Sequence, residues 1–127
     1  MNSKKKGSGG ERELLELLHR YGIQAERNDQ RYLSGEGLPD ILARISGKEI
    51  HVEAKRCEKL KLTEWIAQAN YDVSFTPHRI PIVIFRRNRQ PWYCTISFEN
   101  FMKLLNIEKK EDESHETDTA GKRLLEK

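Results

Sequence analysis

Apolar and polar residues alternate along residues 38–55, with a break at Ser46-Gly47. This period of two predicts a β-strand on each side of the break. Gly47 readily adopts a positive φ, so Ser46-Gly47 can form a two-residue hairpin turn. The numbers of facing residues then sum to 93, so that Ile41 faces Val52. The hairpin should therefore have one apolar face, which belongs to the core, and one mostly polar face.

The same register places Asp40 opposite Glu53 on the polar face. Directly opposed side chains have Cβ atoms about 5 Å apart, and at an effective dielectric of about 20 two full charges would repel there by about 3 kcal/mol. A divalent cation would offset this repulsion, and Mg²⁺ prefers carboxylate oxygens. Lys55, on the same face, would place an ammonium beside such a site. The alternation also fits a solvated hairpin face with scattered charges.

Apolar residues at helical spacing predict three helices around the hairpin. They cover Glu11–Tyr21, 62–74 and 98–105. Ser97 can cap the last helix, and its apolar residues should be core or dimer contacts: Phe98, Phe101, Met102 and Leu105. Short β-rich runs at 23–27, 80–85 and 92–96 add three strands. This order indicates an α/β fold with a central mixed β-sheet of about five strands flanked by α-helices.

Length and charge narrow the class of protein. The 127 residues suffice for one domain, which we place at 11–105, between a flexible basic arm at 1–10 and a polar tail at 106–127 that we expect to be disordered. The net charge is +3, and because the tail is acidic, residues 1–105 carry +5, which is compatible with nucleic-acid binding.

Cys57 and Cys94 lack the spacing of zinc ligands, so we expect reduced thiols. With no apolar run near 18 residues and no signal peptide, we expect a soluble, cytoplasmic protein that does not bind membranes.

Two short motifs resemble those of a known group of enzymes. Pro39-Asp40, followed by Glu53-Ala54-Lys55 on the next strand, resembles the PD-(D/E)XK signature of the restriction-endonuclease-like nucleases. Gly10-Glu11-Arg12-Glu13-Leu14-Leu15 resembles the first helix of the archaeal-type Holliday junction resolvases. The resemblance spans about residues 5 to 98. It implies a restriction-endonuclease-like fold, a metal-dependent endonuclease that cuts branched DNA in recombination and repair, and a homodimer that makes two symmetric cuts.

The resemblance also implies roles for four residues. Glu11, Asp40 and Glu53 would hold Mg²⁺, for which Mn²⁺ can substitute, and Lys55 would align or activate the attacking water. Glu11 lies on the helix face of the leucines that point towards the sheet, whereas Glu13 does not. Glu11 also fits a plain capping box with Ser8.

Two further polar residues are weaker candidates. Ser34 resembles a catalytic-loop serine of some resolvases, although a small polar residue before glycine is ordinary in a turn. Gln68 resembles a helix glutamine that orients the site in many relatives, although it also fits a surface amide.

Basic residues gather in three stretches and at one helix position. Each could contact DNA phosphates, and each could equally keep a tail or a hairpin tip soluble. The candidates are Lys4, Lys5, Lys6, Arg12, Arg56, Lys59, Lys61, Arg86, Arg87 and Arg89.

Two other functions remain open at this point. A nuclease that acts on flaps, ends or ordinary duplex would need the same residues. A catalytically silent DNA-binding module would need only the basic surface, and the intact set of Glu11, Asp40, Glu53 and Lys55 argues against it.

Overall fold

The computed structural model describes residues 3–28 and 37–111, with side chains from Gly9 onwards. Its elements are α1 (Ser3–Arg20), β1 (Gln24–Arg27), β2 (Ile41–Ile45), β3 (Lys48–Arg56), α2 (Leu62–Val73), β4 (Ile80–Arg86), β5 (Tyr93–Thr95) and α3 (Phe98–Leu104). The strands form one sheet in the order β1-β2-β3-β4-β5. Only β3 and β4 are parallel, because α2 crosses from the end of one to the start of the other. The α/β fold with a five-stranded mixed sheet is thus confirmed.

The β2–β3 hairpin has the predicted register. Ile41 pairs with Val52, and Arg44 pairs with Glu49, as the sum of 93 requires. The turn residues have positive φ, 53° at Ser46 and 76° at Gly47, which match the twist of a two-residue hairpin. The register therefore fixes which β3 side chains face each side of the sheet.

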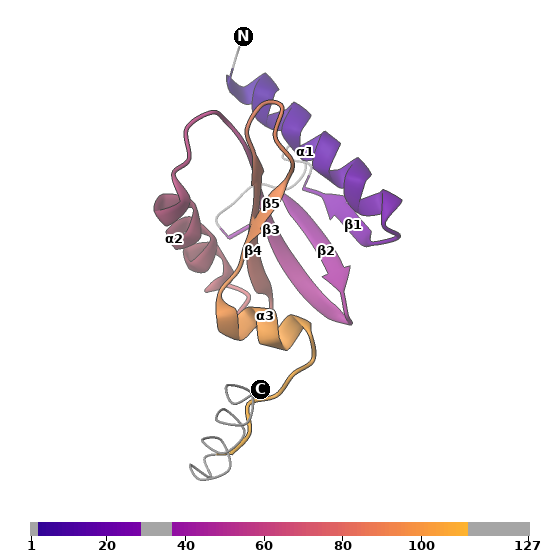
Figure 1. The fold of residues 1–127 in the computed structure, drawn as a ribbon, viewed down its shortest axis with the longest axis vertical. Helices are drawn as coiled ribbons and strands as arrows, with labels where there is room; N and C mark the ends of the chain where they lie inside the picture. Colours follow the sequence, from indigo (N-terminus) through magenta and orange to yellow (C-terminus); the bar gives the residue numbers. More distant parts are fainter. Residues whose placement is uncertain (1–2, 29–36, 112–127) are drawn as a thin grey trace, which may run out of the picture.

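The two faces of the sheet are covered by different helices (Figure 1). On one face, the leucines of α1 pack on the apolar side of the hairpin and on β4 in a core formed by Leu14, Leu18, Ile41, Ala43, Ile50, Val52, Ile80, Ile82 and Ile84. On the other face, Trp65 and Ala69 of α2 pack on Val83 of β4. The polar side of β3 lies on this second face, so α2 covers it and removes part of it from water.

The first helix begins at Ser3, so the predicted helix start at Glu11 is wrong. Glycine disfavours helix by about 1 kcal/mol per residue, which is why the sequence predicted a later start. Packing explains the difference: Gly10 is buried, and a Cβ there would lie 3.1 Å from the Cβ of Arg56. Glycine thus lets α1 approach β3 closely. The capping box at Ser8 is also wrong, because Ser8 lies inside the helix.

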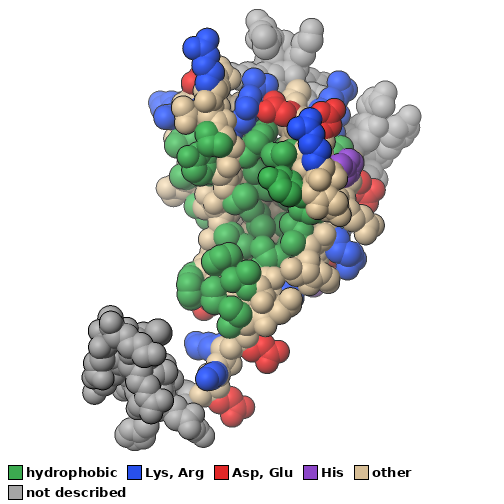
Figure 2. All heavy atoms as spheres, turned by 45° about the vertical axis from the view of Figure 1, so that its right-hand side comes forward, with side chains coloured by type: hydrophobic (Ala, Val, Ile, Leu, Met, Phe, Trp, Pro, Cys, Tyr) green, Lys and Arg blue, Asp and Glu red, His purple; other side chains and the backbone are tan. Residues whose placement is uncertain are grey.

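The last helix carries exposed apolar side chains. Ser97 caps it as predicted, since the Ser97 Oγ accepts a hydrogen bond from the Asn100 amide at 3.1 Å. Phe98 and Phe101 are 73% and 42% exposed, so they do not belong to the core of this chain. Figure 2 shows apolar side chains gathered over this end of the molecule.

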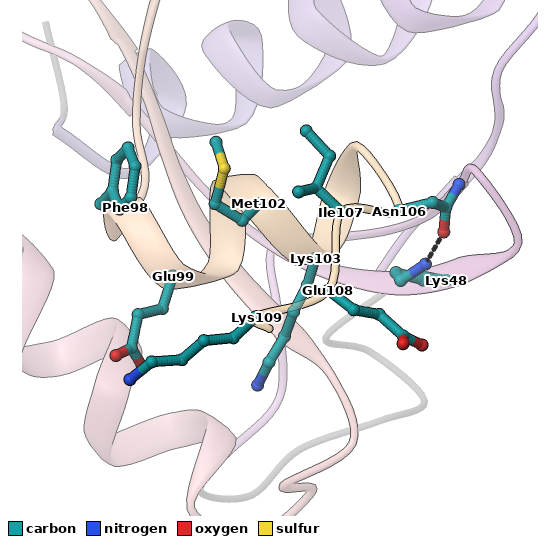
Figure 3. Close-up of a pocket in the computed structure, with 9 residues that line it drawn as sticks. All are labelled: Lys48, Phe98, Glu99, Met102, Lys103, Asn106, Ile107, Glu108 and Lys109. Atoms are coloured by element: carbon teal, nitrogen blue, oxygen red, sulfur yellow. Dashed lines mark hydrogen bonds between the residues drawn. The ribbon is translucent and has the colours of Figure 1, made fainter. Parts of the chain in front are cut away.

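The helix and the chain after it line a groove, shown in Figure 3. Phe98, Met102 and Ile107 point to one side of it, whereas Lys103 and Lys109 point to the other. The groove lies at the turn end of the hairpin, because Lys48, the first residue of β3, also lines it.

Candidate active site

The candidate site lies at the start of β2 and in the middle of β3. Three polar residues of β3, namely His51, Glu53 and Lys55, alternate with apolar ones, so all three point to the face that α2 covers. His51 and Glu53 are 0% and 6% exposed. The hairpin face that was predicted to be polar is therefore buried at His51 and Glu53, and a charge there is costly unless it is paired.

Asp40 is held just before β2 by backbone contacts. Its amide donates to the Val52 carbonyl at 3.1 Å, and its Oδ2 accepts from the Ala54 amide at 2.9 Å. The regular ladder ends at Ile41, so Asp40 and Glu53 are not a ladder pair. The two carboxyl groups nevertheless lie close enough for the charge of Glu53 to act on Asp40. Burial, together with the negative charge of Glu53, raises the pKa of Asp40 to about 6.

Glu53 is the most crowded carboxyl group of the site. Burial and the neighbouring carboxyl group of Asp72 together raise its pKa to about 7, while Asp40 and the charge of Lys55 act in the opposite direction. The Nε2 of His51 lies 2.7 Å from the Glu53 Oε1. Glu53 thus lies between two other carboxyl groups, because it interacts with Asp40 on one side and with Asp72 on the other.

Glu11 reaches the same place from α1. Its Oε2 accepts a hydrogen bond from the Nε of Arg27 at 2.8 Å. Burial raises the pKa of Glu11, and the nearby charge of Asp40 also raises it, whereas the charges of Arg27 and Lys55 lower it. Glu13 instead contacts Arg56 and Arg86, at 3.4 and 3.2 Å. The structure therefore brings Glu11, and not Glu13, to Asp40 and Lys55.

Two residues of the site were missed by the sequence reasoning. His51 and Asp72 are buried beside Glu53, and the ligand atoms of these three residues all lie within 4.8 Å of one another. A signal existed for Asp72, because its spacing from Trp65 and Ala69 continues the buried stripe of α2.

The two weaker candidates have different outcomes. The Nε2 of Gln68 donates to the Asp72 Oδ1 at 2.9 Å, so Gln68 touches the site through Asp72. Ser34 lies outside the described residues.

The donor set fits a hard divalent cation. Glu11, Asp40 and Glu53 offer carboxylate oxygens, which Mg²⁺ and Mn²⁺ prefer. Burial and mutual repulsion raise the pKa values of these groups, so the metal-free site gains from any positive charge placed among them. Lys55 supplies one such charge.

Several arginines predicted to bind DNA have partners within the chain. Arg56 and Arg86 both contact Glu13, and the guanidinium of Arg86 lies 5.6 Å from the ring centre of Trp92. The Nε of Arg87 donates to the Glu58 carbonyl at 3.1 Å. Exposed candidates without such contacts in the part of the chain that the structure describes are Arg12, Lys59, Lys61 and Arg89. The side chains of Lys4, Lys5 and Lys6 lie outside the described residues.

Comparisons with known proteins agree with this geometry. A family model described as "Phage putative PDDEXK endonuclease" matches residues 2–122. Among solved structures, a Holliday junction resolvase of Archaeoglobus fulgidus matches with a TM-score of 0.54 at 24% identity, over 68% of this chain and 72% of that one, which shows a shared fold. A search of the curated proteins finds no match. In the described part of the chain, no helix is long and apolar enough to cross a membrane.

Proposed function

Because this chain belongs to that phage family of PD-(D/E)XK endonucleases, we propose that it is a metal-dependent DNA endonuclease that cuts four-way junctions. The observation that carries the proposal is the meeting of Glu11, Asp40, Glu53 and Lys55 at one point of the sheet. Glu11 comes from α1, Asp40 directly precedes β2, and Glu53 and Lys55 come from β3. The spacing of Pro39-Asp40 and Glu53-Ala54-Lys55 is that of the PD-(D/E)XK signature. A silent DNA-binding module would gain nothing from burying three carboxyl groups beside one another.

The chemistry follows from the residues present. Glu11, Asp40 and Glu53 would hold Mg²⁺, or Mn²⁺ in its place. When bound, such a cation lowers the pKa of a water and neutralises phosphate oxygens. The ammonium of Lys55 would align the attacking water and offset the charge that develops on the phosphorus oxygens. The amide of Ala54 fixes the Asp40 carboxylate, so this ligand needs no rearrangement before the reaction.

A homodimer is part of the proposal. Resolution of a four-way junction needs two symmetric cuts, which a two-fold dimer with two sites can make. Exposed Arg12, Lys59, Lys61 and Arg89 would contact phosphates around each site.

One assay tests the proposal. The protein would be incubated with labelled four-way junction, flap and linear duplex of the same sequence, each with Mg²⁺ or with EDTA. We expect cleavage only with Mg²⁺ and in preference on the junction. Equal cleavage of junction and duplex would reject the resolvase specificity, and no cleavage of any DNA would reject the nuclease. Asp40→Asn is the control for a contaminating nuclease.

A further inference from the structure

Glu53 has two buried neighbours that the proposed reaction does not use. His51, on β3, is 0% exposed, and Asp72, on α2, is 8% exposed. The ligand atoms of His51, Glu53 and Asp72 lie within 4.8 Å of one another. Ligands of one cation, each about 2.1 Å from it, lie up to about 4.2 Å apart, so a small closure of this triangle would admit an ion.

Among the described residues, the nearby charge of Lys55 acts on Glu53, but neither Glu53 nor Asp72 is in a direct ion pair with a lysine or arginine. Asp72 accepts a hydrogen bond from the amide of Gln68, and Glu53 contacts His51, Asp40 and Asp72. A buried pair of adjacent carboxyl groups is costly without a positive charge between them.

His51 is an independent indication of a ligand. One ring nitrogen contacts Glu53, whereas the other, Nδ1, is buried without a hydrogen-bond partner in the described part of the chain. A buried polar atom without a partner is rare in native proteins and commonly marks an ion or a water.

We propose that His51, Glu53 and Asp72 form a second divalent-cation site, that Glu53 joins it to the first site, and that it prefers Mn²⁺ to Mg²⁺. The preference follows from the donor set, because Mn²⁺ binds carboxylates and, as a transition metal, also accepts an imidazole nitrogen, whereas Mg²⁺ takes oxygen ligands almost exclusively. Gln68 would act as a positioning residue that orients the Asp72 carboxylate by its hydrogen bond. The inference rests on the proposed function only in sharing Glu53.

Cation stoichiometry tests the proposal directly. Isothermal titration of the full chain, with Mn²⁺ electron paramagnetic resonance as a second readout, should give two Mn²⁺ per chain and one Mg²⁺. Asp72→Asn should bind one Mn²⁺ and keep Mg²⁺ affinity within threefold. Glu64→Gln, an exposed residue of α2 that loses the same charge, should still bind two Mn²⁺. A single Mn²⁺ on the wild type, or two on Asp72→Asn, would overturn the second site.

Two further variants separate this inference from the proposed function. Asp40→Asn should lose cleavage and Mg²⁺ binding and still bind one Mn²⁺ at the second site. His51→Gln keeps an amide that can contact Glu53 but offers no imidazole, so it should weaken the second Mn²⁺ at least tenfold and leave Mg²⁺ unchanged. Unchanged Mn²⁺ binding in a folded His51→Gln variant would contradict the proposal. Absence of DNA cleavage by the wild type would instead reject the nuclease and leave the cation counts standing.

Discussion

At the scale of single residues, the candidate site consists of charged side chains that are removed from water, because His51, Glu53 and Asp72 are all buried. Asp40, Glu53 and Lys55 were placed on one hairpin face by alternation alone, and the leucine stripe placed Glu11 above it. His51 and Asp72 were missed because their burial requires α2 to lie on the polar side of β3. The alternation of residues 48–56 does not indicate that α2 packs on the polar side of β3.

The first prediction concerns Asp40→Asn. The amide oxygen can still accept from the Ala54 amide, while the charge beside Glu53 is lost. Cleavage should fall at least about 100-fold, because a ligand and its charge are removed. Thermal melts in EDTA should show equal or higher stability than the wild type, since a repulsive buried charge is gone. In Mg²⁺ the wild type should gain stability by mass action and the variant much less. A variant that melts lower in EDTA and still cuts DNA would contradict the metal assignment.

The second prediction concerns pH. Asp40 and Glu53 have higher pKa values when folded, about 6 and about 7, than the ordinary values of 3.8 and 4.5. The folded protein therefore binds protons more tightly than the unfolded chain. Without metal, the contribution of these groups is fully present below about pH 4 and is lost as pH rises through 6 and 7, with a cost on the order of a few kcal/mol. Urea unfolding at pH 5 and pH 8 in EDTA should show this fall, and Mg²⁺ should reduce it. Equal stability at both pH values would contradict the coupled carboxyl groups.

At the scale of elements, register was easier to predict than helix ends. The hairpin register follows from two local facts, the alternation and the Ser46-Gly47 turn, so the structure reproduces it. The start of α1 follows from a contact distant in sequence, that of Gly10 with Arg56. Propensity alone argues for a later start, and tertiary packing overrides it.

The third prediction tests that explanation with two adjacent glycines. Gly9 is exposed in α1, and a Cβ there would meet nothing within 4 Å, so Gly9→Ala should stabilise the fold by about 0.5–1 kcal/mol. Gly10→Val should destabilise it by about 1–3 kcal/mol, because the side chain would press on Arg56 and push α1 from β3. Urea unfolding measures both. Two neutral substitutions would mean that α1 does not extend over these residues.

At the scale of the whole molecule, the basic surface is smaller than the sequence suggested. Arg56 and Arg86 form ion pairs with Glu13, so part of the basic excess stabilises the contact of α1 with β3 and β4. Composition could predict the sign of the surface charge, but not which arginines have partners. The basic residues that remain candidates for contacts with DNA phosphates are those with exposed side chains.

The fourth prediction follows from this difference. Lys61→Ala and Arg89→Ala should each lower the slope of log K against log salt for DNA binding by about one, with little change in stability. Arg86→Ala should lower the melting temperature, because Glu13 and Trp92 lose a partner. Binding at several salt concentrations, together with melts, distinguishes the two classes. Unchanged slopes for Lys61→Ala and Arg89→Ala would assign those residues to solubility.

The last prediction concerns assembly. Phe98 and Phe101 are exposed on α3, so the interpretation of these residues as core is wrong within one chain, and dimer contact remains. Exposed apolar patches of this kind are typical of interfaces, where phenylalanine is enriched. Light scattering should give about twice the 14.9 kDa chain mass at micromolar concentration. Phe98→Ser combined with Phe101→Ser should give the monomer with an unchanged fold, and it should still bind Mg²⁺ because the groove lies at the far end of the hairpin from Asp40. Tyr21→Ser, which removes an equally exposed aromatic ring beyond α1, is the control and should remain dimeric. A double variant that stays dimeric would place the interface elsewhere on the molecule.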